Sequence, residues 1–263
     1  MVEHGQLSNG IRIVLEKMAT CRSVSFGIWV KTGSRNEKPS NNGISHFIEH
    51  MLFKGTERFS AKEIAEVFDG IGGNVNAFTS KEYTCFYAKV LDEHVPIAVD
   101  VLADMFYRSK LDDEELAKEK NVILEEISMY EDTPDDIVHD MIAKAAYGEH
   151  SLGMPILGTA PNLAAMTSDD LRRYIDGHYG NEAVVVSVAG NIGDSITEMF
   201  EYYFGREELP KRSVQTDAVT APDFVAGHSF LRKKTEQNHL CIAMPGCSQD
   251  DPLLYAMILL NNA

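Results

Sequence analysis

The sequence predicts an α+β fold in which helices pack against a mostly antiparallel sheet. Two strand patterns open the chain at residues 10–16 and 23–30, and apolar residues alternate along the second, so that they face one side of a sheet. Several segments with helical periodicity follow. A nearly continuous apolar run at residues 183–190 then indicates a buried strand. This order of strands and helices is typical of the α+β class.

The residues between these strands are expected to form a loop, a strand pair and several helices. The loop spans residues 32–42 and is rich in serine and asparagine. Ser60 and Glu63 have the spacing of a capping box, which predicts a helix start. The expected helices cover residues 43–52, 60–68, 94–107, 111–130, 134–146 and 168–179, and the strand pair covers residues 76–79 and 83–91.

Length and composition allow one large domain or two smaller ones. The chain has 263 residues, 44% of them hydrophobic, which is enough to bury a sizeable core. Residues 208–222 hold two prolines and few apolar side chains, and they form the best linker candidate. A strand expected at residues 239–246 and a helix at residues 252–260 weakly repeat the order seen near the N-terminus. We therefore expect one complete domain at residues 1–207 and the beginning of a similar, truncated second domain at residues 223–263.

The helix expected at residues 43–52 carries two histidines and a carboxylate at zinc-hydrolase spacing. His46 and His50 are four residues apart, which places them about 40° apart around a helix axis. Glu49 lies about 60° from His46 on the other side. The order H-x-x-E-H is the inverse of the commoner H-E-x-x-H and is one of the zinc peptidase signatures. Both imidazoles can therefore bind one metal ion, with Glu49 beside it.

A catalytic zinc site needs a third protein ligand, and the acidic helix expected at residues 111–130 offers three candidates. Such sites keep a fourth position open for water. Glu119 and Glu126 are seven residues apart, about two turns, and so share one face of that helix. Spacing alone does not choose among Glu119, Glu125 and Glu126, because an acidic run on a helix is also typical of a solvated face.

Three motifs in order make the sequence resemble the pitrilysin-like peptidases and, within them, the branch of mitochondrial processing peptidase and its bacterial relatives. The motifs lie at residues 46–56, 72–79 and 119–126. The resemblance covers nearly the whole chain and implies His46, His50 and Glu126 as zinc ligands. It also implies Glu49 as the general base and Glu119 as a supporting catalytic carboxylate, and it makes residues 1–207 the zinc-binding peptidase domain.

The resemblance further implies how substrate and partners are held. In the family, the strand that matches residues 74–79 is a sheet edge beside the zinc helix, and an edge has unpaired N–H and C=O groups. We therefore expect an extended peptide to pair with Asn76, Ala77 and Phe78. The family has two similar halves, and its second half supplies an arginine and a tyrosine that no segment here matches. A homodimer, or a heterodimer with a related subunit, is expected to complete the cleft.

The acidic composition bears on partners and compartment. There are 24 basic and 40 acidic residues, a net charge of −16, so nucleic acid is not an expected partner, whereas an acidic cleft would favour cationic peptides. No apolar run reaches the roughly 18 residues of a membrane span, and no cationic segment followed by an apolar one marks secretion. The four cysteines form no C-x-x-C pair and are expected to be reduced. We expect no membrane association and a bacterial cytoplasm, with the mitochondrial matrix as the alternative.

Together these inferences predict a zinc-dependent endopeptidase, with Zn2+ as cofactor, that hydrolyses extended, basic peptides or presequences. The alternative is a non-catalytic structural or regulatory subunit of a peptidase-like complex. Such members usually have a broken zinc motif, and here every residue of the motif is present. A metal-dependent binding module would keep the ligands without needing Glu49.

Overall fold

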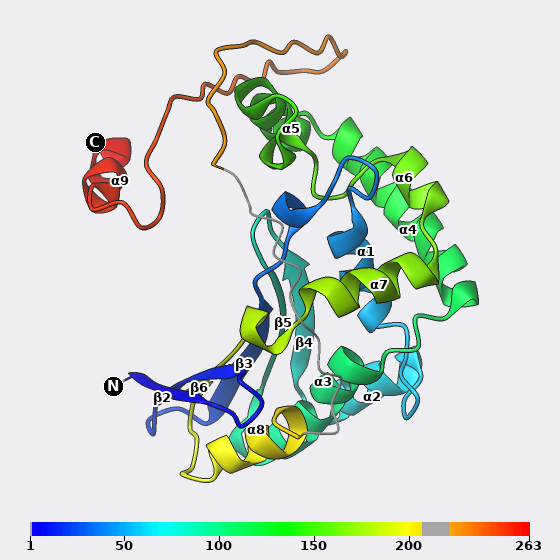
Figure 1. Cartoon of the computed structure of the whole chain (residues 1–263), viewed down its shortest axis with the longest axis vertical. Helices are drawn as coiled ribbons and strands as arrows, with labels where there is room; N and C mark the ends of the chain where they lie inside the picture. The colour runs from blue at the N-terminus through cyan, green and yellow to red at the C-terminus, as the bar shows by residue number, and fades with distance from the viewer. Residues whose placement is uncertain (1, 207–220) are drawn as a thin grey trace.

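One mixed sheet organises residues 2–206, which together with residues 221–263 are described by the computed structural model (Figure 1). Its strands lie in the order β1-β2-β6-β3-β5-β4, and every neighbouring pair is antiparallel except β2 and β6. The strands are β1 (Val2–Gln6), β2 (Arg12–Lys17), β3 (Ser23–Val30), β4 (Asn74–Thr79), β5 (Thr84–Leu91) and β6 (Val184–Gly190). The predicted α+β class is confirmed.

Alternation along the central strands places one face of the sheet in the core. In β3, Val24, Phe26, Ile28 and Val30 are all buried, as a period of two predicts. The neighbouring strands continue this apolar face with Phe86, Ala88, Val90, Val184, Val186 and Val188. The core therefore forms between this face and the helices.

The opposite face of the sheet carries a cluster of aromatic side chains. The ring centroid of Trp29 lies 5.9 Å from that of Phe78 and 5.6 Å from that of Tyr83. The indole N–H of Trp29 donates to Ser187 Oγ (2.8 Å), while Phe78 and Tyr83 are exposed. Because Phe78 belongs to β4, the cluster connects the middle of the sheet to its edge.

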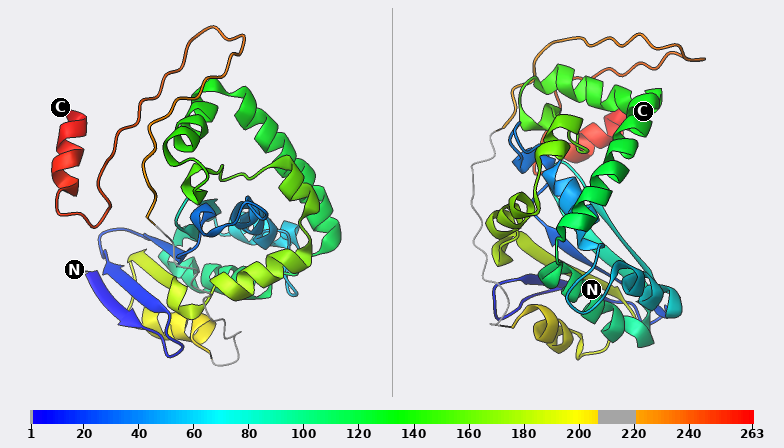
Figure 2. Two further views of the ribbon diagram at one scale, coloured as in Figure 1. Left: turned by 45° about the horizontal axis from the view of Figure 1, so that its top comes forward. Right: turned by 90° about the vertical axis from the view of Figure 1, so that its right-hand side faces the viewer.

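The helices pack mainly on the core face of the sheet, and α4 to α7 form an arc around α1 (Figure 2). α1 contacts β4, α4 and α7. The helices are α1 (Ile44–Leu52), α2 (Ala61–Gly70), α3 (Val95–Arg108), α4 (Asp113–Asp132), α5 (Pro134–Tyr147), α6 (Ala160–Ala165), α7 (Ser168–His178), α8 (Ile196–Phe204) and α9 (Leu254–Asn262). None of the helices in the described ranges is both long and apolar enough to span a bilayer.

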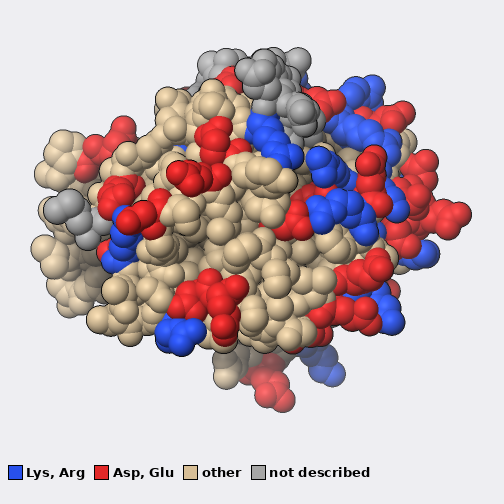
Figure 3. All heavy atoms as spheres, turned by 90° about the horizontal axis from the view of Figure 1, so that it is seen from below, with Lys and Arg blue, Asp and Glu red and all other residues tan. Residues whose placement is uncertain are grey.

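Charged side chains of both signs share the surface near α2, α3 and α8. Figure 3 shows this face from below, with basic and acidic groups interspersed. Lys62 pairs with Glu66 on α2 (3.0 Å), and Arg58 pairs with Asp100 on α3 (2.7 Å). Exposed pairs of this kind contribute little to stability.

Three elements, β1, α6 and α8, are not anticipated by the sequence analysis. β1 is exposed along its whole length, so it lacks the alternation that marks a half-buried strand. α6 has only six residues, too few for a helical period to be recognised. α8 buries one apolar side, formed by Ile196, Phe200 and Phe204, which have the four-residue spacing of a helix.

The chain beyond residue 220 crosses α5 before it ends in α9. The Val225 N–H donates to the Ala146 carbonyl (2.8 Å), at the C-terminal end of α5. The Lys233 ammonium donates to the Glu131 carbonyl (2.8 Å) and pairs with Asp132 (2.6 Å), at the end of α4. These contacts attach the segment to the ends of both helices.

Of the linker, strand and helix expected after residue 207, the described part of the chain contains the helix but not the strand, and it includes only the last two residues of the linker. The linker expected at residues 208–222 lies outside the described residues except at its last two positions. The helix expected at residues 252–260 corresponds to α9. Residues 239–246 do not form the expected strand, because none of the six described strands pairs with them and a strand needs such a partner.

Candidate metal centre

α1 carries the three residues of the H-x-x-E-H motif at the border of the hydrophobic core. Its apolar face is buried against the sheet and neighbouring helices through Ile44, Phe47, Ile48, Met51 and Leu52. His46 is buried, whereas Glu49 and His50 are half-buried. The helix is thus fixed by packing, while Glu49 and His50 stay partly accessible.

α4 supplies the carboxylates that face α1. Asp112 caps this helix by accepting hydrogen bonds from the Glu114 and Glu115 N–H groups (2.9 and 3.1 Å). Ile123 and Ile127 pack into the core. Because these two apolar residues are four apart, they set which side of the 20-residue helix is turned inward.

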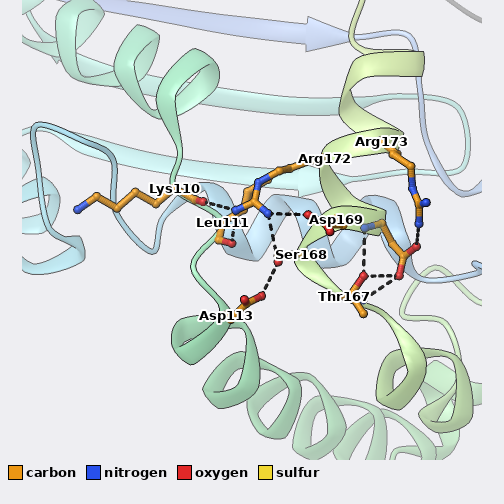
Figure 4. A network of polar contacts seen from close by, with 9 residues as sticks. Lys110, Leu111, Asp113, Thr167, Ser168, Asp169, Arg172 and Arg173 are labelled. Carbon is orange, nitrogen blue, oxygen red and sulfur yellow. Dashed lines mark hydrogen bonds and ion pairs between the residues drawn. The ribbon is translucent and has the colours of Figure 1, made fainter.

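The beginning of α4 is also tied to α7, as Figure 4 shows. Arg172 donates to the carbonyl groups of Lys110 (2.9 Å) and Leu111 (3.1 Å), and Ser168 donates to the Asp113 carboxylate. Leu111 has φ of 47°, a left-handed conformation that residues other than glycine rarely adopt. Contacts on both sides of this turn therefore fix the direction in which α4 leaves it.

One carboxylate oxygen of Glu126 faces a ring nitrogen of each histidine. Glu126 Oε2 lies 3.7 Å from His46 Nε2 and 3.6 Å from His50 Nε2, and the three ligand atoms all lie within 4.8 Å of one another. These separations exceed hydrogen-bond length. They are close to the roughly 3.3–3.6 Å expected between ligand atoms around a tetrahedral zinc ion. Two imidazoles and one carboxylate thus surround a space suited to a cation.

His50 is oriented by a buried carboxylate. Its Nδ1 lies 2.8 Å from Glu119 Oε1, and Lys54 Nζ lies 2.6 Å from the other carboxylate oxygen. Glu119 is only 4% exposed. Because a carboxylate accepts, Nδ1 carries the hydrogen and the Nε2 lone pair is free to bind a metal ion on the Glu126 side.

Replacing Glu119 by glutamine is therefore expected to lower activity by about 10 to 100 fold, with a smaller loss of bound zinc. The amide keeps the shape of the side chain but weakens its attraction for Lys54 and for the His50 N–H. Peptide cleavage and zinc content, measured on the same preparations, check this. An unchanged turnover rate would contradict a supporting role for Glu119.

His46 is suited to metal binding by its protonation state. Burial, with a further contribution from the nearby His50, lowers the pKa of His46 to about 3. The imidazole is consequently neutral near pH 7, which is the form that binds a metal ion.

Glu49 lies on the same helix and hydrogen-bonds to β4. Thr79 Oγ1 donates to Glu49 Oε2 (2.5 Å). Burial raises the pKa of Glu49, and the Thr79 hydrogen bond acts in the opposite direction. A carboxylate with a raised pKa beside a metal site is a suitable acceptor for a proton from water.

Replacing Thr79 by valine is expected to move the acid limb of the pH–rate profile to higher pH. The hydroxyl stabilises the charged carboxylate, so its loss raises the pKa of Glu49 further, and Glu49 then becomes protonated at a higher pH as the pH falls. The measurement is kcat/KM against pH. Thr133→Val is the control, since its hydroxyl donates to the Met129 carbonyl at the far end of α4 (2.7 Å). An acid limb at an unchanged pH in Thr79→Val would contradict an effect of the Thr79 hydroxyl on the pKa of Glu49.

The three glutamates among which spacing alone does not choose a third ligand occupy different positions. Glu126 faces the histidines, Glu119 contacts His50 through its Nδ1, and Glu125 is exposed. The rotation of α4 turns Glu125 away from α1, whereas Glu119 and Glu126 share one face and differ in their position along the helix.

β4 forms an edge of the described sheet beside α1. The Ala77 N–H donates to Asn76 Oδ1 on the same strand (2.8 Å). Asn76 and Phe78 are exposed, and Ala77 is half-buried. The three residues predicted to bind substrate therefore lie at an accessible strand edge.

Sequence reasoning missed two partners of the motif residues, Lys54 and Thr79. Both lie inside the family motifs, at residues 46–56 and 72–79, but the resemblance implies no role for either. Lys54 follows His50 by four residues, so one helical turn could have suggested that the two share a partner. Thr79 is distant from Glu49 in the chain, and nothing in the spacing connects them.

Comparison with known families agrees with this geometry. A sequence model of the insulinase family, peptidase family M16, matches residues 12–160, which is more than half of the chain. The chain belongs to peptidase family M16. A second model, of the M16 inactive domain, matches residues 165–263. The predicted family is confirmed, whereas the processing-peptidase branch stays a prediction.

Several bacterial M16 relatives are similar over most or all of the chain. An uncharacterized zinc protease of Bacillus subtilis, YmxG, is 55% identical over 262 residues, which are 100% of this chain and 63% of the relative. An uncharacterized zinc protease of Streptomyces coelicolor is 41% identical over 268 residues, covering 100% of this chain and 58% of the relative. The chain thus spans about three fifths of the length of these relatives.

Solved structures share the fold at low sequence identity. A protease from Helicobacter pylori has a TM-score of 0.76 and 23% identity, covering 85% of this chain and 54% of that protein. The periplasmic protease PqqL of Escherichia coli has a TM-score of 0.73 and 21% identity, covering 81% and 24% respectively. At these identities the likeness supports the M16 domain fold alone.

Proposed function

We propose that this chain carries the zinc site of a metalloendopeptidase of family M16. The observation that carries the proposal is the approach of Glu126 Oε2 to both His46 Nε2 and His50 Nε2, at 3.7 and 3.6 Å, with Glu49 on the same helix. His46, His50 and Glu126 would hold the ion. The relatives' names as zinc proteases agree with this choice of metal.

The side chains of α1 fit the hydrolysis of a peptide bond. When bound, zinc supplies a Lewis acid that polarises a carbonyl group and acidifies water. Glu49 accepts a proton from the attacking water and donates it to the leaving amine. Thr79 holds the Glu49 carboxylate in place, and Glu119 keeps the hydrogen of His50 on Nδ1.

We infer that the substrate is an extended, basic peptide, such as a presequence, bound along β4. An extended chain can pair with the free edge of this strand while its side chains enter pockets. The excess of acidic residues, 40 against 24 basic, favours a cationic substrate. Because pairing uses the backbone, we expect broad specificity among unfolded peptides and exclusion of folded proteins.

Replacing Ala77 by proline is expected to raise KM without removing zinc. The Ala77 N–H donates to Asn76 Oδ1 on the same strand, and β4 is an edge strand, so we expect its loss to spare the sheet while removing a donor from the edge. Steady-state kinetics with a peptide of at least six residues checks the effect. Ala189→Pro in β6, a central strand, should instead destabilise the fold. Normal KM in Ala77→Pro would contradict substrate pairing at this edge.

We propose further that residues 1–207 form the peptidase domain, residues 208–222 a linker and residues 223–263 the start of a second, similar domain. The second family model begins at residue 165, yet β6 lies between β2 and β3 in the sheet, which supports keeping it in the first domain. A second half of the protein or a companion subunit would then form the opposite wall of the cleft, as a homodimer or heterodimer.

The proposed function is tested by zinc content together with cleavage of a quenched basic peptide. The expected result is one zinc ion per chain and faster cleavage of the basic peptide than of an acidic peptide with the same length. Stoichiometric zinc without cleavage would favour the non-catalytic subunit. A folded chain that binds no zinc would overturn the metal centre itself.

A further inference from the structure

The N-terminus of α1 lacks an ordinary capping side chain. The N-cap residue is Gly43, which has φ of +100° and no side chain to accept a hydrogen bond. The first N–H groups of a helix have no partner within the helix, and serine, threonine, aspartate or asparagine usually provides one from the N-cap position. Another group must therefore satisfy the start of the helix that carries His46 and His50.

The carboxylate of Glu37 takes this role from outside the helix. Glu37 Oε1 accepts from the Ser45 N–H (2.9 Å), and Oε2 accepts from the Gly43 N–H (2.8 Å) and from Asn42 Nδ2 (2.9 Å). Glu37 is only 5% exposed. All three contacts come from N–H groups, which can only donate. The atoms at both the Oε1 and the Oε2 position of residue 37 must therefore be acceptors.

Close packing on the far side prevents the start of α1 from shifting. A Cβ added to Gly43 would lie 2.8 Å from Gly158 Cα and 2.9 Å from the Leu157 carbonyl oxygen. Asn42 Nδ2 also donates to the Pro155 carbonyl (2.9 Å). The turn before the helix is thus held between Glu37 and the segment at residues 155–158.

The two histidines of α1 are held in different ways. His50 Nδ1 hydrogen-bonds to Glu119. In contrast, His46 Nδ1 is buried, and no partner for it exists among the described residues. Metal-binding histidines usually have their second nitrogen fixed by a carboxylate, a carbonyl group or water. The direction of the His46 ring therefore depends on the backbone of α1 and on packing.

We propose that Glu37 is a positioning residue for His46. Glu37 Oε1 binds the N–H of Ser45, the residue directly before His46, and so fixes the helical turn from which the imidazole projects. Ser45 Oγ lies 3.2 Å from Tyr174 OH, which holds the same turn against α7. The proposal rests on the proposed function, in which His46 is a zinc ligand, and it gives each histidine a carboxylate of its own.

Glu37→Gln tests this role because the two side chains have nearly the same shape. The amide replaces one acceptor oxygen with an NH2 group, so in either orientation a donor faces at least one of the three N–H groups. We expect zinc to bind about 10 to 100 fold more weakly, as measured by competition with a chelator. Glu37→Asp restores two acceptor oxygens and the charge, so it should bind zinc more tightly than Glu37→Gln.

Glu63→Gln is the matched control. Glu63 is also a helix-capping carboxylate, accepting from the Ser60 N–H (2.7 Å), but it lies at the start of α2. The zinc affinity of the Glu63→Gln variant should stay within about twofold of that of the wild type. All measurements are made well below the unfolding midpoint of each variant. A general loss of stability would then leave zinc affinity unchanged, whereas loss of positioning weakens it.

A measurement without metal separates this proposal from the proposed function. In the metal-free protein, amide hydrogen exchange at residues 44–47 should be faster in Glu37→Gln than in the wild type, with smaller changes in α2. Unchanged exchange together with unchanged zinc affinity would overturn the role of Glu37. If the wild type binds no zinc, the proposed function fails, and the exchange comparison still decides whether Glu37 fixes α1.

Discussion

Replacing Glu49 by glutamine is expected to lower kcat by about 10² to 10⁴ fold while zinc stays bound. Glu49 does not share the space enclosed by His46, His50 and Glu126, so its loss leaves all three ligand atoms in place. The amide cannot accept the proton of the attacking water. Turnover of the quenched basic peptide and zinc content, measured on the same sample, check this expectation.

The control for this variant is Glu57→Gln, an exposed glutamate that lies outside the site. It should keep wild-type turnover, because it removes one negative charge without touching α1 or Thr79. A Glu49→Gln variant with more than about a tenth of the wild-type kcat would contradict proton transfer by Glu49.

Replacing Glu126 by glutamine, or His50 by alanine, is expected to remove zinc and activity together. Each change deletes one of three ligand atoms, so the loss of affinity should exceed the roughly 100-fold effect of changing an outer partner. Glutamine keeps the shape of Glu126 but cannot carry the negative charge. Chelator competition and metal analysis of the purified variants measure the effect.

Glu125→Gln provides the matched comparison for Glu126→Gln. Both positions are on α4, they differ by one residue, and Glu125 is exposed. Zinc should remain bound in Glu125→Gln. The reverse pattern, with stoichiometric zinc in Glu126→Gln and none in Glu125→Gln, would assign the ligand to Glu125 instead.

Local patterns in the sequence predicted the elements that build the site. The periodicity of α1 and α4 and the spacing of His46 and His50 depend on residues close together in the chain. Neighbouring residues on a helix are about 100° apart, so Glu125 and Glu126 point in different directions. Which of them faces α1 depends on tertiary packing, and spacing left this open. The family resemblance implied Glu126, and the structure places Glu126 near both histidines.

The parts of the site that sequence reasoning missed are contacts between distant or irregular segments. Glu37 lies six residues before Gly43 in a loop, so no capping-box spacing identifies it. Thr79 reaches Glu49 from β4, 30 positions along the chain. Neither contact follows from a helical or strand period, because each depends on how separate elements pack.

The aromatic cluster on the face of the sheet opposite the core provides an intrinsic fluorescence probe for β4, the strand proposed to bind substrate. Trp29 is the single tryptophan of the chain, and its ring lies 5.9 Å from that of Phe78, on the strand proposed to pair with peptides. A peptide added to β4 would alter the surroundings of Phe78, and Trp29 is close enough to respond. The intrinsic fluorescence of the unlabelled protein should therefore change when peptide binds, even in a variant that cannot cleave it.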